Sequence, residues 1–332
     1  MVEAKGLLHI QELSVTFPSR DGRVTILDRV SFEVPENEIV GLVGESGSGK
    51  TMTSLTVMGF LPPSGQVAGG EIWFKGKDLL HLTEEEMQEV RGREIAMIFQ
   101  STRSALNPLM RVGDQVARVY QIQQQLSAQE AYREAVRMLG RMGIPDAEKR
   151  AQAYPHQLSG GMCQRVLVAM MVTCEPALLI ADEPTTGLDV TIQAQIFELI
   201  KDVQQSTGAS ILLITHDLGV IAETCQRVVV MYAGQVMETA PVETLFAEPC
   251  HPYTQRLLKS VLRVDRIVEM PERDLTPSEE ATYSLSGCRF APCCPVVLPC
   301  CWEERPTRKE FKSDHWLSCH RYEEIDGTII AG

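Results

Sequence analysis

The chain has 332 residues, of which 44% are hydrophobic and 23% charged, and its formal net charge is −13. This composition can bury a full core and, at roughly 100–200 residues per domain, predicts two domains or one large domain with an appendage. The acidic balance argues against a general basic surface for nucleic acid, and we expect no nucleic-acid partner. No apolar run approaches the roughly 20 residues that span a bilayer and no signal peptide is visible, so we expect a soluble, cytosolic chain.

The N-terminal stretch predicts a half-buried sheet. Leu13, Val15 and Phe17 alternate with polar residues, a period of two that is typical of a strand with one buried face. Residues 72–74, Ile-Trp-Phe, add another strand to this sheet.

Four continuous apolar runs predict a second sheet, at residues 39–43, 177–181, 211–215 and 228–231. Because these runs alternate with helical stretches, they indicate a mostly parallel sheet covered on both faces by helices. Residues 84–167 contain few strand signals, and the apolar residues of 128–142 recur at helical spacing. We therefore expect a helical subdomain, at about residues 100–170, inserted into the α/β core.

Residues 44–51, GESGSGKT, match the phosphate loop G-x-x-x-x-G-K-S/T between an apolar strand and a helix that starts near Thr51. Glycines let successive N–H groups point at phosphate oxygens, and the helix N-terminus adds a favourable dipole. Lys50 can reach the β- and γ-phosphates, and the Thr51 hydroxyl can ligate Mg²⁺. The flanking strand and helix disfavour the alternative, a flexible Gly/Ser turn. The predicted binding residues are Gly44, Ser46, Gly47, Gly49, Lys50 and Thr51.

A second acidic site follows the apolar run that ends at residue 181. Ligands of open α/β sheets lie at the carboxyl ends of the strands, where this run delivers Asp182 and Glu183. Asp182 is suited to hold Mg²⁺, and Glu183 is placed to polarise a water in line with the γ-phosphate. Taken alone, Asp-Glu-Pro is more often the exit of a strand, and the phosphate loop is what favours catalysis.

Residues 158–165, LSGGMCQR, resemble the signature of ABC-type ATPases. Gln100 resembles the glutamine of that family's Q-loop, residues 187–189 its D-loop, and His216 its switch histidine. Each of these features has an ordinary structural interpretation when taken alone, and their common order carries the resemblance. It implies an ATPase that works in head-to-tail pairs.

The resemblance implies roles for these residues. Ser159 and Gly161 would contact the γ-phosphate of a nucleotide held by the partner subunit. Gln100 would sense Mg²⁺ and nucleotide, and His216 would orient the γ-phosphate and the attacking water. Phe17 would stack on adenine, although a strand core residue fits its position equally well. The Mg²⁺ ligands implied are Thr51, Gln100 and Asp182.

Three further segments resemble the oligopeptide/dipeptide/nickel importer ATPases: Asn-Pro at 107–108, YPHQ at 154–157 and HPYT at 251–254. Cys163 and Gly187 depart from that pattern without touching the residues assigned to chemistry. The resemblance implies transmembrane permease subunits as partners, docked on about residues 101–117, and indirectly a solute-binding protein. It also implies a second ATPase subunit, identical or different, and a peripheral position on the cytoplasmic face of the bacterial inner membrane.

Ten cysteines are present, and six of them lie between Cys288 and Cys319. Without a signal peptide, this density favours a thiolate metal site over a disulfide module. The resemblance covers this tail too and places Cys288, Cys294, Cys301 and Cys319 at the family's cysteine positions. It favours a [4Fe-4S] cluster over Zn²⁺, both of which accept four soft ligands, and over reduced structural thiols without a metal. Cys293 and Cys300 are extra thiols that leave the ligand set open.

The fold class expected is α/β: a P-loop NTPase core of the ABC ATPase type with an antiparallel β subdomain and an inserted helical subdomain. We expect the nucleotide-binding domain at residues 1–253, a linker at 254–286 and a small cysteine-rich domain at 287–332. The predicted function is ATP hydrolysis that powers an importer of peptides or nickel. The alternatives are a soluble ABC ATPase without a transport role and an iron–sulfur sensor with regulatory ATP binding.

Overall fold

The structure is a computed structural model that describes residues 6–19, 22–100, 105–261 and 282–321. The chain divides into two compact units. The first consists of Met1–Val34, Val40–Leu80 and Thr215–Gly332, and the second of Pro35–Ile39 and His81–Ile214. Each unit is described by itself.

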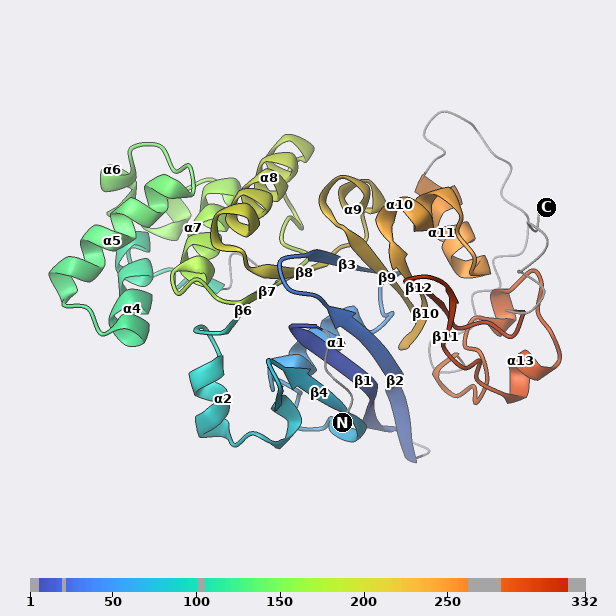
Figure 1. Cartoon of the computed structure of the whole chain (residues 1–332). Helices are drawn as coiled ribbons and strands as arrows, with labels where there is room; N and C mark the ends of the chain where they lie inside the picture. Colours follow the sequence, from blue (N-terminus) through green and yellow to red (C-terminus); the bar gives the residue numbers. More distant parts are fainter. Residues whose placement is uncertain (1–5, 20–21, 101–104, 262–281, 322–332) are drawn as a thin grey trace. The chain divides into compact units, whose positions relative to one another are not determined.

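The first unit begins with an antiparallel sheet in the order β2-β1-β4-β5 (Figure 1). Alternate residues of β1 are buried, among them Leu8, Ile10, Leu13 and Val15, which confirms the predicted half-buried sheet. The strands are β1 (Leu8–Ser19), β2 (Gly22–Val34), β4 (Gln66–Phe74) and β5 (Lys77–Asp78).

A second sheet of this unit runs β11-β12-β10-β9-β3. Strands β3 and β9 are parallel, whereas β10 and β12 are added antiparallel. The strands are β3 (Ile39–Val43), β9 (Arg227–Tyr232), β10 (Gln235–Pro241), β11 (Lys309–Lys312) and β12 (His315–Leu317). The helices are α1 (Lys50–Val57), α9 (Leu218–Thr224), α10 (Val242–Ala247), α11 (Pro252–Val261) and α13 (Cys300–Glu303), with 3₁₀ turns at Leu79–His81 and Ala291–Cys293.

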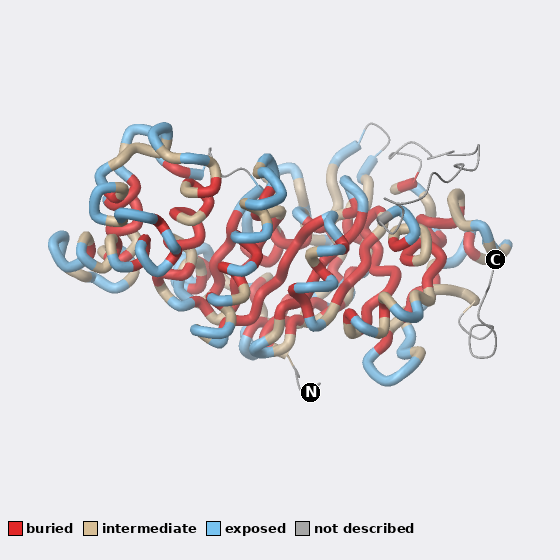
Figure 2. Tube along the Cα trace, turned by 90° about the horizontal axis from the view of Figure 1, so that it is seen from above, coloured by how far each residue is buried: buried red, intermediate tan, exposed pale blue. Residues whose placement is uncertain are grey.

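The second unit contains three parallel strands in the order β8-β7-β6 and a group of helices. The strands are buried along their whole length, and Figure 2 shows buried residues concentrated in strands and exposed residues on the outer turns of helices. The elements are α2 (Glu84–Val90), β6 (Ile95–Ile98), α4 (Val112–Gln124), α5 (Ala128–Arg141), α6 (Ala147–Ala151), a 3₁₀ turn (Pro155–Gln157), α7 (Gly160–Val172), β7 (Leu178–Asp182), α8 (Val190–Thr207) and β8 (Ser210–Ile214).

The predicted helix at residues 128–142 is α5, which begins at a capping box formed by Ser127 and Glu130. The four predicted apolar runs correspond to β3, β7, β8 and β9, with ends that differ by one residue or less. Residues 262–281, which make up most of the predicted linker, lie outside the described residues, so the domain boundaries stay predictions. Within the described part of the chain, no helix has the length and apolar character needed to cross a membrane.

Candidate functional site

The predicted phosphate loop connects buried β3 to the first turn of α1. Its glycines adopt conformations that other residues avoid: φ is 153° at Gly44, 77° at Gly47 and 100° at Gly49. A Cβ on Gly44 would lie 2.1 Å from the Met231 carbonyl oxygen. The loop thus follows a path that only glycine permits at this position, with its backbone curled at the start of a helix.

Lys50 is the first residue of α1 and is 6% exposed. Its Nζ donates to the carbonyl oxygens of Gly44 at 2.8 Å and Glu45 at 2.9 Å, and to Ser48 Oγ at 3.2 Å. The ammonium group is therefore directed into the concave side of the loop. Phosphate oxygens are acceptors of the same kind as these carbonyls, with a stronger charge.

Two tyrosines from the C-terminal part of the chain contact this loop, and neither contact was predicted from the sequence. The Tyr253 hydroxyl accepts a hydrogen bond of 3.0 Å from the Glu45 backbone N–H. The Tyr283 hydroxyl donates to the Gly47 carbonyl. Tyr253 belongs to the His-Pro-Tyr segment noted in the sequence, and this segment was the signal that could have indicated a functional role for Tyr253.

Two other predicted residues of the first unit have defined places. Phe17 is half-buried on β1, pairs with Val24, and its ring lies where a Cβ on Gly65 would be 2.7 Å away. His216 is exposed and precedes Asp217, which caps the N-terminus of α9. Their contacts with nucleotide stay predictions.

In the second unit, the ends of β6 and β7 bring Gln100 and Glu183 together. The two strands are parallel with Ile98 opposite Ala181, so the residues that follow them emerge at one edge of the sheet. Gln100 Nε2 donates to Glu183 Oε2 at 2.8 Å, and Thr186 Oγ1 donates to the same oxygen at 3.0 Å. The site thereby presents a carboxylate held by two donors. Asp182 is 1% exposed at the end of β7.

The predicted signature forms the start of α7. Ser159 is its N-cap, and its hydroxyl accepts from the Met162 N–H at 3.3 Å. Gly161 is buried against α8, because a Cβ there would lie 2.6 Å from Ile192 Cγ2. Asp189, the last residue of the predicted D-loop, caps α8. A helix N-terminus with a hydroxyl beside it is the arrangement expected of a phosphate contact.

Four cysteines line one pocket in the C-terminal part of the first unit: Cys288, Cys294, Cys301 and Cys319. They are the four predicted ligands, and the lining of this pocket does not include Cys293 or Cys300. Burial is the largest effect on each of the four thiols and raises its pKa, to about 12 for Cys288 and about 11 for Cys319.

Each pocket sulfur also accepts a hydrogen bond from a nearby backbone N–H, which lowers the thiol pKa and so opposes burial. The donors are Phe290 for Cys288, Val296 for Cys294, Leu298 for Cys301 and Arg321 for Cys319. Such bonds favour the thiolate, the form that binds metal. Four thiols around one pocket are donors of the type that thiolate-bound metal groups require.

Comparison with known proteins assigns the class. The ABC transporter family model matches residues 27–186. A dimeric ATP-binding cassette in a post-hydrolysis state with ADP and Pi has a TM-score of 0.63 and 25% identity, covering 71% of this chain and 98% of that one. The chain is an ABC-type ATPase, as predicted.

The family follows from the rest of the chain. The model of the oligopeptide/dipeptide transporter C-terminal region matches residues 237–301. The oligopeptide transport ATP-binding protein AppD of Bacillus subtilis is 44% identical, over 96% of this chain and 97% of its own. The dipeptide transport ATP-binding protein DppD of the same organism is 45% identical, over 98% of both chains. The chain belongs to the ATP-binding subunits of oligopeptide/dipeptide ABC transporters.

Proposed function

We propose that this chain hydrolyses ATP to power the uptake of peptides through a permease. Both relatives are named for oligopeptide or dipeptide transport, so peptides are the substrate class proposed, in place of the wider prediction of peptides or nickel. The family models and the names of the relatives describe transporters, which favours this function over a soluble ABC ATPase or a sensor.

The carboxylate of Glu183, held by Gln100 and Thr186 at 2.8 and 3.0 Å, is the observation that carries hydrolysis. In the proposal, Glu183 accepts the proton of the attacking water and His216 orients the γ-phosphate. Thr51, Gln100 and Asp182 provide the Mg²⁺ ligands, directly or through water.

Binding of ATP is assigned to the phosphate loop and Phe17. In place of its present acceptors, Lys50 Nζ would donate to the β- and γ-phosphates. The remaining phosphate contacts come from Gly44, Ser46, Gly47, Gly49 and Thr51. Ser159 and Gly161 would face the γ-phosphate bound by the second ATPase subunit.

The proposed partners are two transmembrane permease subunits, a second ATPase subunit of the same or a related chain, and indirectly a solute-binding protein. No nucleic acid is involved. The proposed location is peripheral, on the cytoplasmic face of the bacterial inner membrane. The docking surface predicted at residues 101–117 begins with residues 101–104, which lie outside the described residues.

Uptake by the assembled transporter tests the proposal. Cells with the transporter carrying the Lys50→Ala chain should lose uptake of a radiolabelled tripeptide, because the phosphate contacts of the ammonium group are removed. Lys201→Ala is the control, since Lys201 pairs with exposed Glu198 on α8. Unchanged uptake by Lys50→Ala, or uptake of nickel instead of peptide, would refute the proposal.

We also infer that Cys288, Cys294, Cys301 and Cys319 hold a [4Fe-4S] cluster. The backbone N–H donated to each of the four sulfurs around one pocket supports it, because such bonds stabilise the thiolates of cluster ligands. The group would supply a cross-link for a small module with little core of its own.

Anaerobic purification with iron, sulfide and zinc analysis tests this inference. We expect about four iron and four sulfide per chain, which follows from the cluster type. Cys294→Ser should lose most of the iron, whereas Cys293→Ser should keep it, since Cys293 does not line the pocket. Colourless protein with one zinc per chain would reject the cluster.

A further inference from the structure

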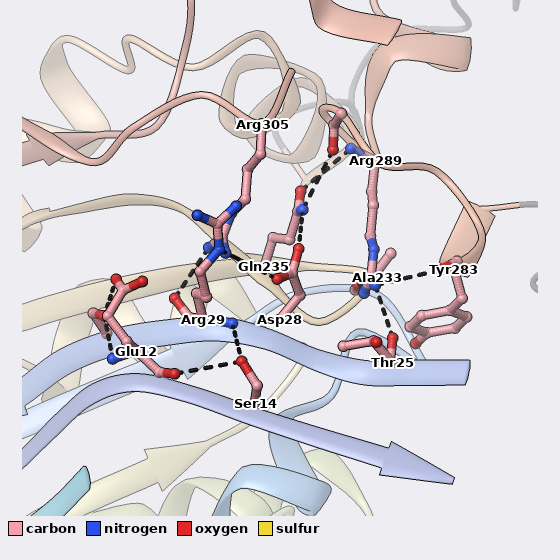
Figure 3. Close-up of polar contacts among 12 residues, drawn as sticks. Glu12, Ser14, Thr25, Asp28, Arg29, Ala233, Gln235, Tyr283, Arg289 and Arg305 are labelled. Carbon is pink, nitrogen blue, oxygen red and sulfur yellow. Dashed lines mark hydrogen bonds and ion pairs between the residues drawn. The ribbon is translucent and has the colours of Figure 1, made fainter. Parts of the chain in front are cut away.

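The C-terminal module, residues 282–321, contacts the phosphate loop of its own chain. The direct contact is made by Tyr283, and beside it lies Arg289, which follows the pocket residue Cys288 and is among the largest fully buried side chains of the described residues. Figure 3 shows this side chain extending from the module toward the turn at Ala233 and the edge of β2.

Arg289 donates to three backbone carbonyls. Nη1 donates to Ala233, and Nη2 donates to Thr25 at 2.7 Å and to Tyr283 at 3.3 Å. The guanidinium also lies over the Tyr283 ring, 5.0 Å from its centroid. A buried cation is costly unless such groups compensate it, so its position is narrowly defined.

The first of these bonds is connected to the phosphate loop through one peptide group. The Ala233 carbonyl and the Gly234 N–H belong to one planar peptide group. The carbonyl accepts from Arg289, and the N–H donates to the Ser48 carbonyl at 2.9 Å. Hydrogen bonds in series through a peptide group polarise and align one another. Arg289 therefore helps to orient the peptide that holds Ser48.

The second route passes through Tyr283. Its hydroxyl donates to the Gly47 carbonyl, and this carbonyl shares a peptide group with the Ser48 N–H. Arg289 holds Tyr283 from the other side through the ring and the backbone carbonyl. Both routes thus converge on adjacent peptide groups in the part of the loop that precedes Lys50.

We propose that Arg289 and Tyr283 are positioning residues for ATP: they fix the peptide groups at Gly47 and Ser48 in the orientation that binds phosphate. The proposal rests on the assignment of ATP to the phosphate loop. A loop ordered in advance does not lose conformational freedom when the nucleotide binds, so its affinity is higher.

The test measures binding of the non-hydrolysable analogue AMP-PNP to the full chain by calorimetry. Tyr283→Phe keeps the ring and removes only the hydroxyl, and it should weaken binding about threefold to tenfold. Arg289→Lys keeps the charge but not the fork of donors, and it should weaken binding at least about tenfold. In the assembled transporter, the KM for ATP should rise while kcat changes less than about twofold.

Arg305→Lys is the matched control. Arg305 also connects the module to β2, through Asp28 Oδ1 and the Arg29 carbonyl at 3.0 Å each, rather than through the Ala233 carbonyl or Tyr283. It should lower the Tm and leave AMP-PNP binding unchanged. Equal weakening by Arg305→Lys would assign the effect to general loosening of the module and overturn the proposal.

Lys50→Ala distinguishes a failure of this proposal from a failure of the nucleotide site on which the proposal rests. If Lys50→Ala abolishes AMP-PNP binding while Tyr283→Phe and Arg289→Lys bind as the unmodified chain does, only the positioning role is wrong. If Lys50→Ala binds normally, the nucleotide site itself is wrong. Should Arg289→Lys fail to fold, Tyr283→Phe decides the question alone.

Discussion

Gln100 and Glu183 are 83 residues apart in the chain and meet through a hydrogen bond of 2.8 Å. They meet because each follows one of two neighbouring parallel strands. The backbone of Glu183 lies in the left-handed region at φ 44°, a conformation that tertiary structure must hold in place. Backbone strain is concentrated at functional sites, which agrees with the catalytic role proposed for Glu183.

Glu183→Gln should reduce ATP turnover at least about 100-fold, because the amide cannot accept the proton of the attacking water. The affinity for ATP should stay within about threefold, since the change preserves size and removes no contact proposed for the nucleotide. Phosphate release by the purified transporter measures the rate. Glu198→Gln, the same change on the exposed face of α8, is the control, and full turnover by Glu183→Gln would contradict the assignment.

Gly161→Ala should destabilise the second unit by about 1–3 kcal/mol through overpacking. The added Cβ would lie 2.6 Å from Ile192 Cγ2 on α8, so the Ile192 side chain or the first turn of α7 must shift. Adding Ile192→Ala makes room, and the double variant should recover part of the lost Tm. Thermal melts of the two single variants and the double variant measure this coupling. A Gly161→Ala chain as stable as the parent would show that α7 and α8 accommodate the added methyl group without loss of stability.

At acidic pH the folded structure around the start of α11 should be less stable. Burial lowers the pKa of His251 to about 4 from 6.5, against the opposite effect of Glu238. The neutral ring accepts a hydrogen bond of 3.0 Å from the Tyr253 N–H at Nδ1. The pKa of His251 is lower in the folded chain than in the unfolded chain. The stability that the neutral ring contributes is therefore fully present above pH 6.5 and decreases as the pH falls to about 4. Between pH 7.5 and 5.5 the loss is about 1 kcal/mol.

His251→Asn is the matched variant for that measurement. An asparagine oxygen accepts from the N–H two residues ahead and does not titrate. Its Tm should therefore change less between pH 7.5 and 5.5 than that of the unmodified chain. Parallel pH dependence in both proteins would exclude His251 as the cause.

Removal of the proposed cluster from the cysteine pocket should weaken binding of AMP-PNP. Cys288 donates its N–H to the Cys301 carbonyl at 2.8 Å and precedes Arg289, so loss of the proposed cluster would loosen the residue that donates to Ala233. Cys288→Ser should reduce affinity about as much as Arg289→Lys, and the two effects should not add. Cys300→Ser is the control, and equal affinity with and without the group would contradict the link.

Local patterns in the sequence predicted much of this structure. The glycines and Lys50 of the phosphate loop stand in a short contiguous motif, and β3, β7, β8 and β9 are continuous apolar runs of the kind that buried parallel strands require. The resemblance supplied the roles of Gln100 and Ser159, which no periodicity could indicate.

The contacts of Tyr283 and Arg289 could not be predicted in the same way. The bonds from Tyr283 to Gly47 and from Arg289 to Ala233 join residues more than 50 positions apart, and Tyr283 lies in a polar stretch that suggested only a linker. Their partners are backbone carbonyls. Every residue has one, so residue types do not indicate which carbonyl accepts the bond. The six cysteines predicted a binding site in this part of the chain. The direction in which Arg289 extends depends on tertiary packing.

Strand β12 pairs with β10 through Glu238 and Thr239. β12 therefore covers a strand edge that would otherwise present unpaired N–H and C=O groups to other molecules. During synthesis this edge stays open until β12 has left the ribosome. A nascent or prematurely terminated chain is thus exposed to aggregation through β10, even where its phosphate loop and strands have already formed.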